Sequence, residues 1–272
     1  RASRTVLDLP EPVEMLAQVV APVDAAGARP LVVLLHGRHE TCYRPATGRL
    51  SVAWPCPDGT EAVPSHRGFT YLQRHLASRG FVTVSISANG INAQDTPTED
   101  GGTAARSVLV RRHLNLWSQW AAPGGSWEGR VDLQKVLLIG HSRGGEGVQR
   151  VAIDSNASAP CRVRGTVALA PTAALRQTPA YTPTTTLLPT CDGDVVSLDG
   201  QVFVDRPRDV ADDPALRSAI AVVGGNHNFF NTEWTPGLAA APANDDWGGR
   251  GGVCGKGTPT RLSGAEQRRV GQ

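Results

Sequence analysis

Val136–Gly145 (VLLIGHSRGG) is the stretch of sequence that decides the fold. Its first four residues are apolar and predict a short buried strand, and apolar residues then continue at helical spacing after the serine. Gly140 to Gly144 matches the pattern G-x-S-x-G, in which a tight strand-to-helix turn lifts the serine hydroxyl clear of a sheet. A plain glycine-rich turn is the alternative, but the flanking strand and helix favour Ser142 as a nucleophile.

Similar patterns surround this motif along the chain. Strand-like segments rich in apolar and β-branched residues occur at 31–35, 81–87, 165–170, 185–188 and 220–223, and helical spacing occurs at 69–78 and 104–120. Strands that alternate with helices predict right-handed βαβ units and a mostly parallel central sheet with helices on both faces. Residues 13–20 are expected to add an antiparallel edge strand, and the connection 171–184 is too short for a large lid domain. We expect one α/β domain over residues 1–272, with a last helix that has only begun where the sequence ends.

Composition excludes several classes of protein. The 272 residues carry a formal net charge of +2 and no basic stripe, which argues against a nucleic-acid partner. No segment approaches the roughly 20 apolar residues that span a bilayer. Five cysteines without a CxxC pair argue against a zinc site and favour a secreted, oxidised protein.

A serine nucleophile needs a base, and His227 is the best candidate among the seven histidines. It follows the apolar run 220–223 within Gly-Gly-Asn-His-Asn, which places it on a loop beyond the carboxyl end of the last predicted strand. Catalytic groups of open α/β sheets gather at that edge. A surface-loop histidine is the alternative. His36 and His39 could suggest a metal pair, but no further ligands accompany them.

A third group must orient the imidazole and stabilise its protonated form. Asp192 and Asp194 both stand in Cys-Asp-Gly-Asp-Val after the predicted strand 185–188, in the chain order Ser, Asp, His. We favour Asp194, because two valines follow it, whereas Asp192 is suited to accept hydrogen bonds from turn amides. Backbone amides should stabilise the oxyanion, and the amides of Arg143 and Arg38 are the expected donors.

The cysteines favour two disulfides. Cys42 and Cys56 lie close together in the long Gly/Pro-rich stretch 38–68, where a bridge would stiffen a segment with little core. Cys191 precedes the acid loop and Cys254 follows the base loop, so a bridge between them would brace both, leaving Cys161 as the free thiol. Five acidic residues raise the alternative of a calcium site, but solvated loops are the preferred interpretation: Asp95, Glu99, Asp100, Asp245 and Asp246.

These residues together resemble the α/β-hydrolase superfamily over nearly the whole chain. The elbow Gly140–Gly145 is similar to that of the chlorophyllase, dienelactone hydrolase and cutinase-like branch, and the blocks 88–92, 191–194 and 226–230 resemble a group of secreted bacterial hydrolases. The long cysteine-bearing loop after Arg38 departs from typical cutinases. The resemblance implies a serine carboxylester hydrolase that works through an acyl-enzyme, without a cofactor, on small or polymeric esters.

Two other functions remain open at this stage. An amidase or peptidase would use the same side chains on a harder leaving group, and nothing in the sequence separates it from an esterase. A catalytically silent binding module on a hydrolase scaffold is a different class, since the fold does not dictate activity. That interpretation usually requires the loss of a catalytic group, and all three are present here.

Overall fold

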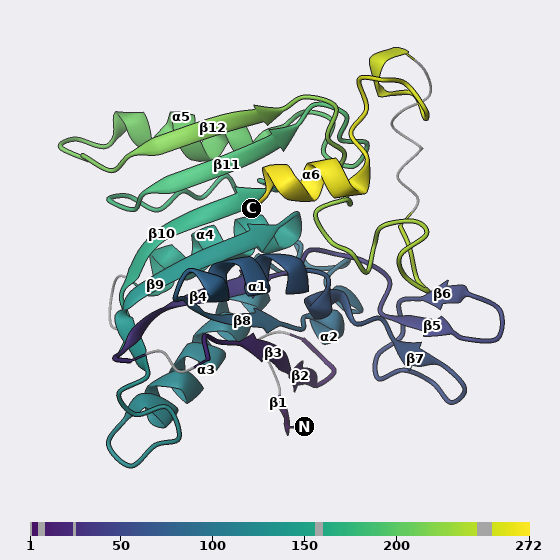
Figure 1. The fold of residues 1–272 in the computed structure, drawn as a ribbon. Coiled ribbons are helices and arrows are strands. Elements are labelled where there is room, and N and C mark those ends of the chain that lie inside the picture. Colours follow the sequence, from purple (N-terminus) through teal and green to yellow (C-terminus); the bar gives the residue numbers. More distant parts are fainter. Residues whose placement is uncertain (1, 5–8, 24–25, 156–159, 244–251) are drawn as a thin grey trace.

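The computed structural model describes residues 2–4, 9–23, 26–155, 160–243 and 252–272. Within these residues a seven-stranded sheet forms the centre of the molecule, in the order β12-β11-β10-β9-β4-β8-β3 (Figure 1). Its strands are β3 (Ala17–Val20), β4 (Arg29–Leu35), β8 (Val82–Ile86), β9 (Val131–His141), β10 (Val163–Leu169), β11 (Thr184–Pro189) and β12 (Arg217–Val222). All neighbouring pairs are parallel except β3 with β8. This confirms the predicted sheet and its antiparallel edge.

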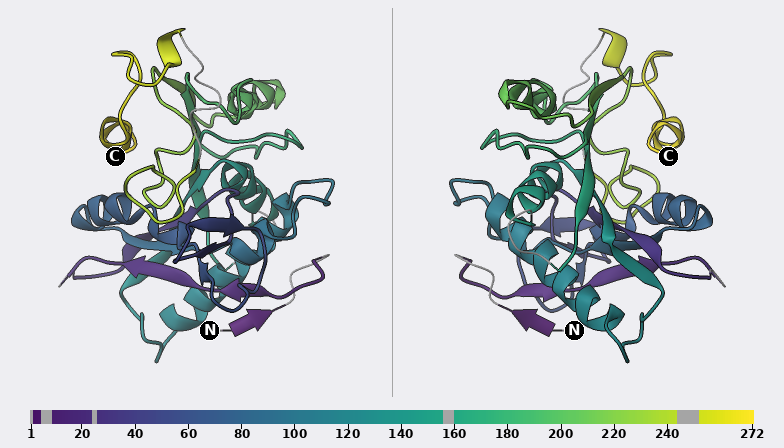
Figure 2. Two further views of the ribbon diagram at one scale, coloured as in Figure 1. Left: turned by 90° about the vertical axis from the view of Figure 1, so that its right-hand side faces the viewer. Right: turned by 90° about the vertical axis from the view of Figure 1, so that its left-hand side faces the viewer.

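Helices cover both faces of the sheet. Figure 2 shows α1 (Thr70–Ser78) and α6 (Gly264–Val270) on one side, and α3 (Thr103–Ala121), α4 (Arg143–Ser155) and α5 (Val202–Asp205) on the other. The remaining short elements are β1 (Ala2–Arg4), β2 (Val13–Met15), α2 (Asn89–Asn92), η1 (Ser65–Arg67), η2 (Asp199–Gln201), η3 (Arg206–Asp209) and η4 (Gly252–Cys254).

The apolar run of β4 explains why both faces are covered. Leu31, Val33 and Leu35 belong to the core beneath α3 and α4, whereas Val32 and Leu34 belong to the core that contains residues of α1. Alternate residues of a strand point to opposite faces, so an unbroken apolar run requires a cover on each side. The sequence of β4 therefore specifies a fully buried central strand.

The connection 170–183 between β10 and β11 contains no helix or strand, and every one of its residues is described. The architecture is that of an α/β-hydrolase without a large lid domain, as the sequence predicts. In the described part of the chain, no helix combines the length and apolar character needed to cross a membrane.

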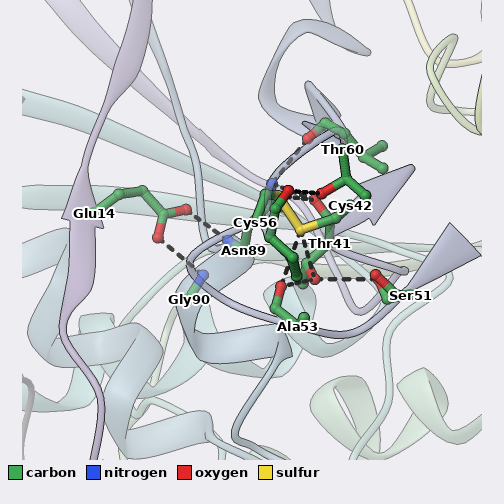
Figure 3. The surroundings of a disulfide bond; sticks show 11 residues. Glu14, Thr41, Cys42, Ser51, Ala53, Cys56, Thr60, Asn89 and Gly90 are labelled. Atoms are coloured by element: carbon green, nitrogen blue, oxygen red, sulfur yellow. Dashed lines mark hydrogen bonds between the residues drawn. A yellow bond between two sulfur atoms is a disulfide. The ribbon is translucent and has the colours of Figure 1, made fainter. Parts of the chain in front are cut away.

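The stretch 38–68 has more structure than the sequence suggested. It contains a small antiparallel sheet in the order β6-β5-β7, made of β5 (Cys42–Arg44), β6 (Arg49–Ser51) and β7 (Glu61–Ala62). The predicted disulfide Cys42–Cys56 is confirmed and links β5 to the connection between β6 and β7 (Figure 3). The side chain of Asn89 donates to the Val63 carbonyl at 2.8 Å, which fixes the stretch to the start of α2.

Three buried histidines make the stability of the fold depend on pH. Burial lowers the pKa of His36 to about 3 and the pKa values of His66 and His113 to about 4. In the unfolded chain each takes up its proton near the ordinary value of about 6.5. Between these values the unfolded chain binds more protons, so the free energy of unfolding falls as the pH falls from about 6.5 towards 4.

Replacing His113 with glutamine tests this effect. We expect the decrease in the free energy of unfolding between pH 7 and pH 4.5 to become smaller by about 2 kcal/mol, because one proton-binding site of the unfolded chain is removed. Urea unfolding of both proteins at the two pH values measures this difference. An equal decrease in the wild type and the His113→Gln variant would contradict the prediction.

Candidate active site

Ser142 sits on a sharp turn between β9 and α4. Its φ of 56° lies in the left-handed region, which costs a non-glycine residue about 1–3 kcal/mol and is common at functional sites. The turn is held by hydrogen bonds from the Ser142 amide to the Leu169 carbonyl (2.9 Å) and from the Gly145 amide to the Ser142 carbonyl (2.8 Å). The strand, turn and helix that the sequence predicts around the serine are therefore present.

The glycines of the motif are required by close backbone contacts. A Cβ on Gly140 would lie 2.1 Å from the carbonyl oxygen of Gly144, and a Cβ on Gly144 would lie 2.4 Å from that of Leu35. Both distances are too short for any side chain, and both contacts involve backbone that cannot move aside. The tight turn thus explains the spacing G-x-S-x-G.

His227 follows β12 and contacts Asp192, which follows β11. Nδ1 of His227 lies 2.8 Å from Oδ2 of Asp192, and both side chains are 1% exposed. Oδ1 of the same carboxylate accepts hydrogen bonds from the amides of Asp194 (2.8 Å) and Val195 (2.6 Å). Asp192 is thus fixed by its own turn while its second oxygen meets the imidazole.

Asp194 occupies a different position. Its side chain is 51% exposed, and its Oδ2 lies 3.4 Å from Nε2 of His227, on the opposite side of the ring from Asp192. The structure therefore places Asp192, and not the favoured Asp194, against Nδ1 of His227. Binding of turn amides does not prevent contact with the histidine, because one oxygen of Asp192 accepts from the amides while the other meets the imidazole.

His141, the residue before the serine, packs against the histidine loop. Its ring centroid lies 4.9 Å from that of His227 and 5.0 Å from that of Trp234. Burial, and then the neighbouring His227, lower the pKa of His141 well below its ordinary value, so the ring stays neutral. Its Nε2 donates to the His227 carbonyl at 2.7 Å, because a carbonyl oxygen can only accept. His141 thereby fixes the backbone of His227.

The loop after β4 lies directly against the serine. A Cβ on Gly37 would lie 2.3 Å from Cβ of Ser142, so only glycine fits there. The Gly37 carbonyl accepts from Nδ1 of His36 (2.8 Å) and from Nδ2 of Asn92 (3.0 Å). Nε2 of His36 accepts from the Ala88 amide at 2.9 Å, which places the single imidazole proton on Nδ1.

These two donors fix the orientation of the Gly37–Arg38 peptide unit. In a trans peptide the N–H points away from the C=O, so the Arg38 amide faces away from His36 and Asn92. Arg143 is the first residue of α4, and the first amides of a helix have no acceptor within it. This role of His36 and Asn92 was not predicted: His36 was considered only as half of a metal pair, and Asn92 only as part of the block 88–92.

A cavity of about 260 Å³ opens above the serine. Four of the residues predicted for the site line it: Arg38, Ser142, Arg143 and Asp194. The other lining residues are Thr172, Val195, Val196, Ser197 and Asp199. Asp194 both lines this cavity and lies 3.4 Å from Nε2 of His227.

The disulfide Cys191–Cys254 is confirmed and links residues 63 positions apart. Cys191 directly precedes Asp192, so the bridge ties the turn that holds the carboxylate to the segment after the histidine loop. The fifth cysteine, Cys161, is buried with a free thiol, as expected.

Loss of this bridge is expected to destabilise the fold more than loss of Cys42–Cys56. A disulfide that closes a longer loop lowers the entropy of the unfolded chain more. We therefore expect the free energy of unfolding to fall by about 4 kcal/mol without Cys191–Cys254 and by about 3 kcal/mol without Cys42–Cys56. Chemical unfolding of the two double cysteine-to-serine variants measures both losses. A larger loss for the shorter loop would contradict this ranking.

The described residues contain no group of three or more potential ligands arranged for a metal ion. Asp95 is fully buried and contacts three arginines, so a solvated loop is the wrong interpretation for this residue. Asp100 accepts from the amides of Gly102 and Ala104 at the start of α3. Asp245 and Asp246 lie outside the described residues.

Comparison with known proteins agrees with this architecture. A family model described as PET hydrolase-like matches residues 56–238, which include the elbow, Asp192 and His227. A search of curated proteins finds no match. The family model covers more than half of the chain, together with most of the central sheet. The chain therefore belongs to the PET hydrolase-like family, and this membership implies an ester hydrolase of the α/β-hydrolase type.

Proposed function

We propose that this protein is a serine hydrolase that cleaves carboxylic esters through an acyl-enzyme intermediate. The observation that carries the proposal is the contact between Asp192 and His227 at the edge of the sheet where Ser142 stands on a strained turn. The three side chains follow β9, β11 and β12, whose carboxyl ends meet at one edge. Nucleophilic catalysis by a serine needs a hydroxyl, an imidazole and a carboxylate close together, and this placement at one edge supports such a role.

In the proposed mechanism, Oγ of Ser142 attacks the carbonyl carbon of the ester while Nε2 of His227 takes the hydroxyl proton. Asp192 keeps the other imidazole proton on Nδ1 and stabilises the ring when it becomes positive. The tetrahedral intermediate expels the alcohol, which takes the proton from Nε2. A water molecule then attacks the acyl-serine with the same histidine as base, releasing the acid and restoring the hydroxyl.

The oxyanion of each tetrahedral intermediate is proposed to bind the amides of Arg38 and Arg143. Two observations support these donors: the Gly37 carbonyl is held on the far side of its peptide, and α4 begins at Arg143. The amino-terminal end of α4 adds a positive dipole at the same place. Donors fixed before the reaction stabilise developing negative charge without a reorganisation cost.

The substrate class follows from the cavity and the family. The cavity is lined largely by polar and charged side chains, and no lid covers it in the described residues. This favours esters that are bulky or part of a polymer, and the family match makes PET itself a substrate to test.

The two disulfides fit an extracellular protein, and we propose that this one is secreted.

Matched substrates test the proposal. We expect p-nitrophenyl butyrate to be hydrolysed with an initial burst of nitrophenol close to the enzyme concentration, because nitrophenol is a good leaving group and acylation is then faster than hydrolysis of the acyl-enzyme. The corresponding butyric p-nitroanilide should react far more slowly, which separates an esterase from an amidase. Absence of hydrolysis of any ester, PET film included, would contradict the proposed function and favour a binding module.

A further inference from the structure

A single buried carboxylate connects the two residues proposed to form the oxyanion hole. Asp95 follows α2, and its side chain is 0% exposed. Its Oδ1 lies 3.4 Å from Nε of Arg38 and 3.0 Å from Nη1 of Arg143. These contacts join the loop after β4 to the first turn of α4, and both arginines line the cavity.

A third guanidinium completes the cluster. Nη2 of Arg106, on α3, lies 2.8 Å from Oδ2 of Asp95, and this arginine is also fully buried. The same Nη2 donates to Oδ1 of Asn92 at 2.6 Å, and Asn92 in turn donates to the Gly37 carbonyl at 3.0 Å. Asp95 is therefore also connected, through Arg106 and Asn92, to the Gly37–Arg38 peptide.

Stability alone is a poor explanation for this cluster. Burying charged groups is costly, and a buried ion pair is often no more stabilising than well-packed apolar side chains. Here one carboxylate contacts three arginines, and the backbone amides of two of them, Arg38 and Arg143, are the proposed oxyanion donors. A role in positioning explains why the cluster connects the loop after β4 to the first turn of α4. A displacement of about 1 Å at a reacting centre can greatly lower the rate.

We propose that Asp95 is a positioning residue that holds the Arg38 and Arg143 amides at the separation the oxyanion requires. This inference rests on the proposed function, because it assigns a role within that site. Asp95 does not touch the substrate; it acts through the two arginine side chains and through Asn92. Its contribution should be greatest in the transition state, when negative charge on the oxygen is largest.

The test compares Asp95→Asn with the wild type on p-nitrophenyl butyrate. We expect kcat to fall by about tenfold to a hundredfold, as when an oxyanion contact is weakened, while KM changes little. The inhibition constant of phenylboronic acid, whose adduct with Ser142 is tetrahedral like the intermediate, should rise by a similar factor. A merely structural role would not weaken this inhibitor selectively.

Asp213→Asn is the matched control. Asp213 is another buried aspartate paired with an arginine, Arg217, at the start of β12 and away from the cavity. Its replacement should destabilise the fold while leaving kcat and the boronate inhibition constant unchanged. Asp95→Glu should recover part of the lost rate, because it restores the negative charge.

Arg143→Met provides a second variant if Asp95→Asn fails to fold. It removes the partly exposed guanidinium but keeps the backbone amide, and it should lower kcat through the same link. In the double variant the two losses should not add, because both changes break one connection. A folded Asp95→Asn protein, or an Arg143→Met protein, with kcat and boronate inhibition within twofold of wild type would overturn the inference. The Ser142→Ala variant tests the proposed function separately. If it hydrolyses the ester as fast as the wild type, the proposed function has failed, whatever the Asp95 variants show.

Discussion

Replacing Ser142 with alanine is expected to lower kcat for ester hydrolysis by about 10⁶-fold, to a residual rate set by binding and the oxyanion hole. The reason is that no other hydroxyl in the proposed mechanism can form the acyl-enzyme, so the burst of nitrophenol should vanish as well. Stopped-flow measurement of nitrophenol release gives both quantities. The fold should remain intact, since removing the hydroxyl leaves the turn and its glycines unchanged.

Ser107→Ala is a suitable control for this variant. The Ser107 hydroxyl, on α3, donates to Asp154 at 2.6 Å and lies outside the cavity. Its loss should leave the rate unchanged. A Ser142→Ala protein that retains more than a few per cent of wild-type activity would show that another group is the nucleophile.

Replacing Asp192 with asparagine is expected to lower kcat by about 10³- to 10⁴-fold. Two turn amides donate to Oδ1 of Asp192, so the amide oxygen of the asparagine must take that place. Its NH₂ group would then face Nδ1 of His227 and move the imidazole proton to Nε2. A histidine protonated at Nε2 cannot accept the serine proton. Steady-state kinetics of the purified variant measure the loss.

The corresponding change at Asp194 separates the two carboxylates. Asp194 is half exposed, so solvent screens its effect on His227, and Asp194→Asn should lower kcat by less than about tenfold. If Asp194→Asn were the more damaging of the two variants, the carboxylate that orients the imidazole would be Asp194 and the contact with Nδ1 would not be the catalytic one.

Much of the fold follows from local sequence patterns. The buried strands β4 and β9 carry apolar runs at 31–35 and 136–139, which lie towards their carboxyl ends. Strand ends were harder to predict: β9 begins at Val131, in a polar stretch that becomes a strand by pairing with its neighbours. The small sheet within 38–68 likewise depends on pairing and on the Cys42–Cys56 bridge.

The positions of two proposed site residues could be predicted from their places in the chain. Ser142 and His227 each follow a recognisable strand, and the topology brings them to one edge. The choice between Asp192 and Asp194 depends on side-chain directions within a single turn, which residue types do not reveal. The contacts of Asp95 could not be predicted either, because the three arginines that surround it come from separate segments of the chain.

The most direct test of the central claim, that Ser142 is a nucleophile activated by His227 and Asp192, is labelling with a fluorophosphonate. The label should be found by mass spectrometry on the tryptic peptide Val136–Arg143, which contains one serine. It should be absent from Ser142→Ala and should form much more slowly in Asp192→Asn. Labelling of a different residue, or equal labelling of the wild type and Ser142→Ala, would contradict the claim.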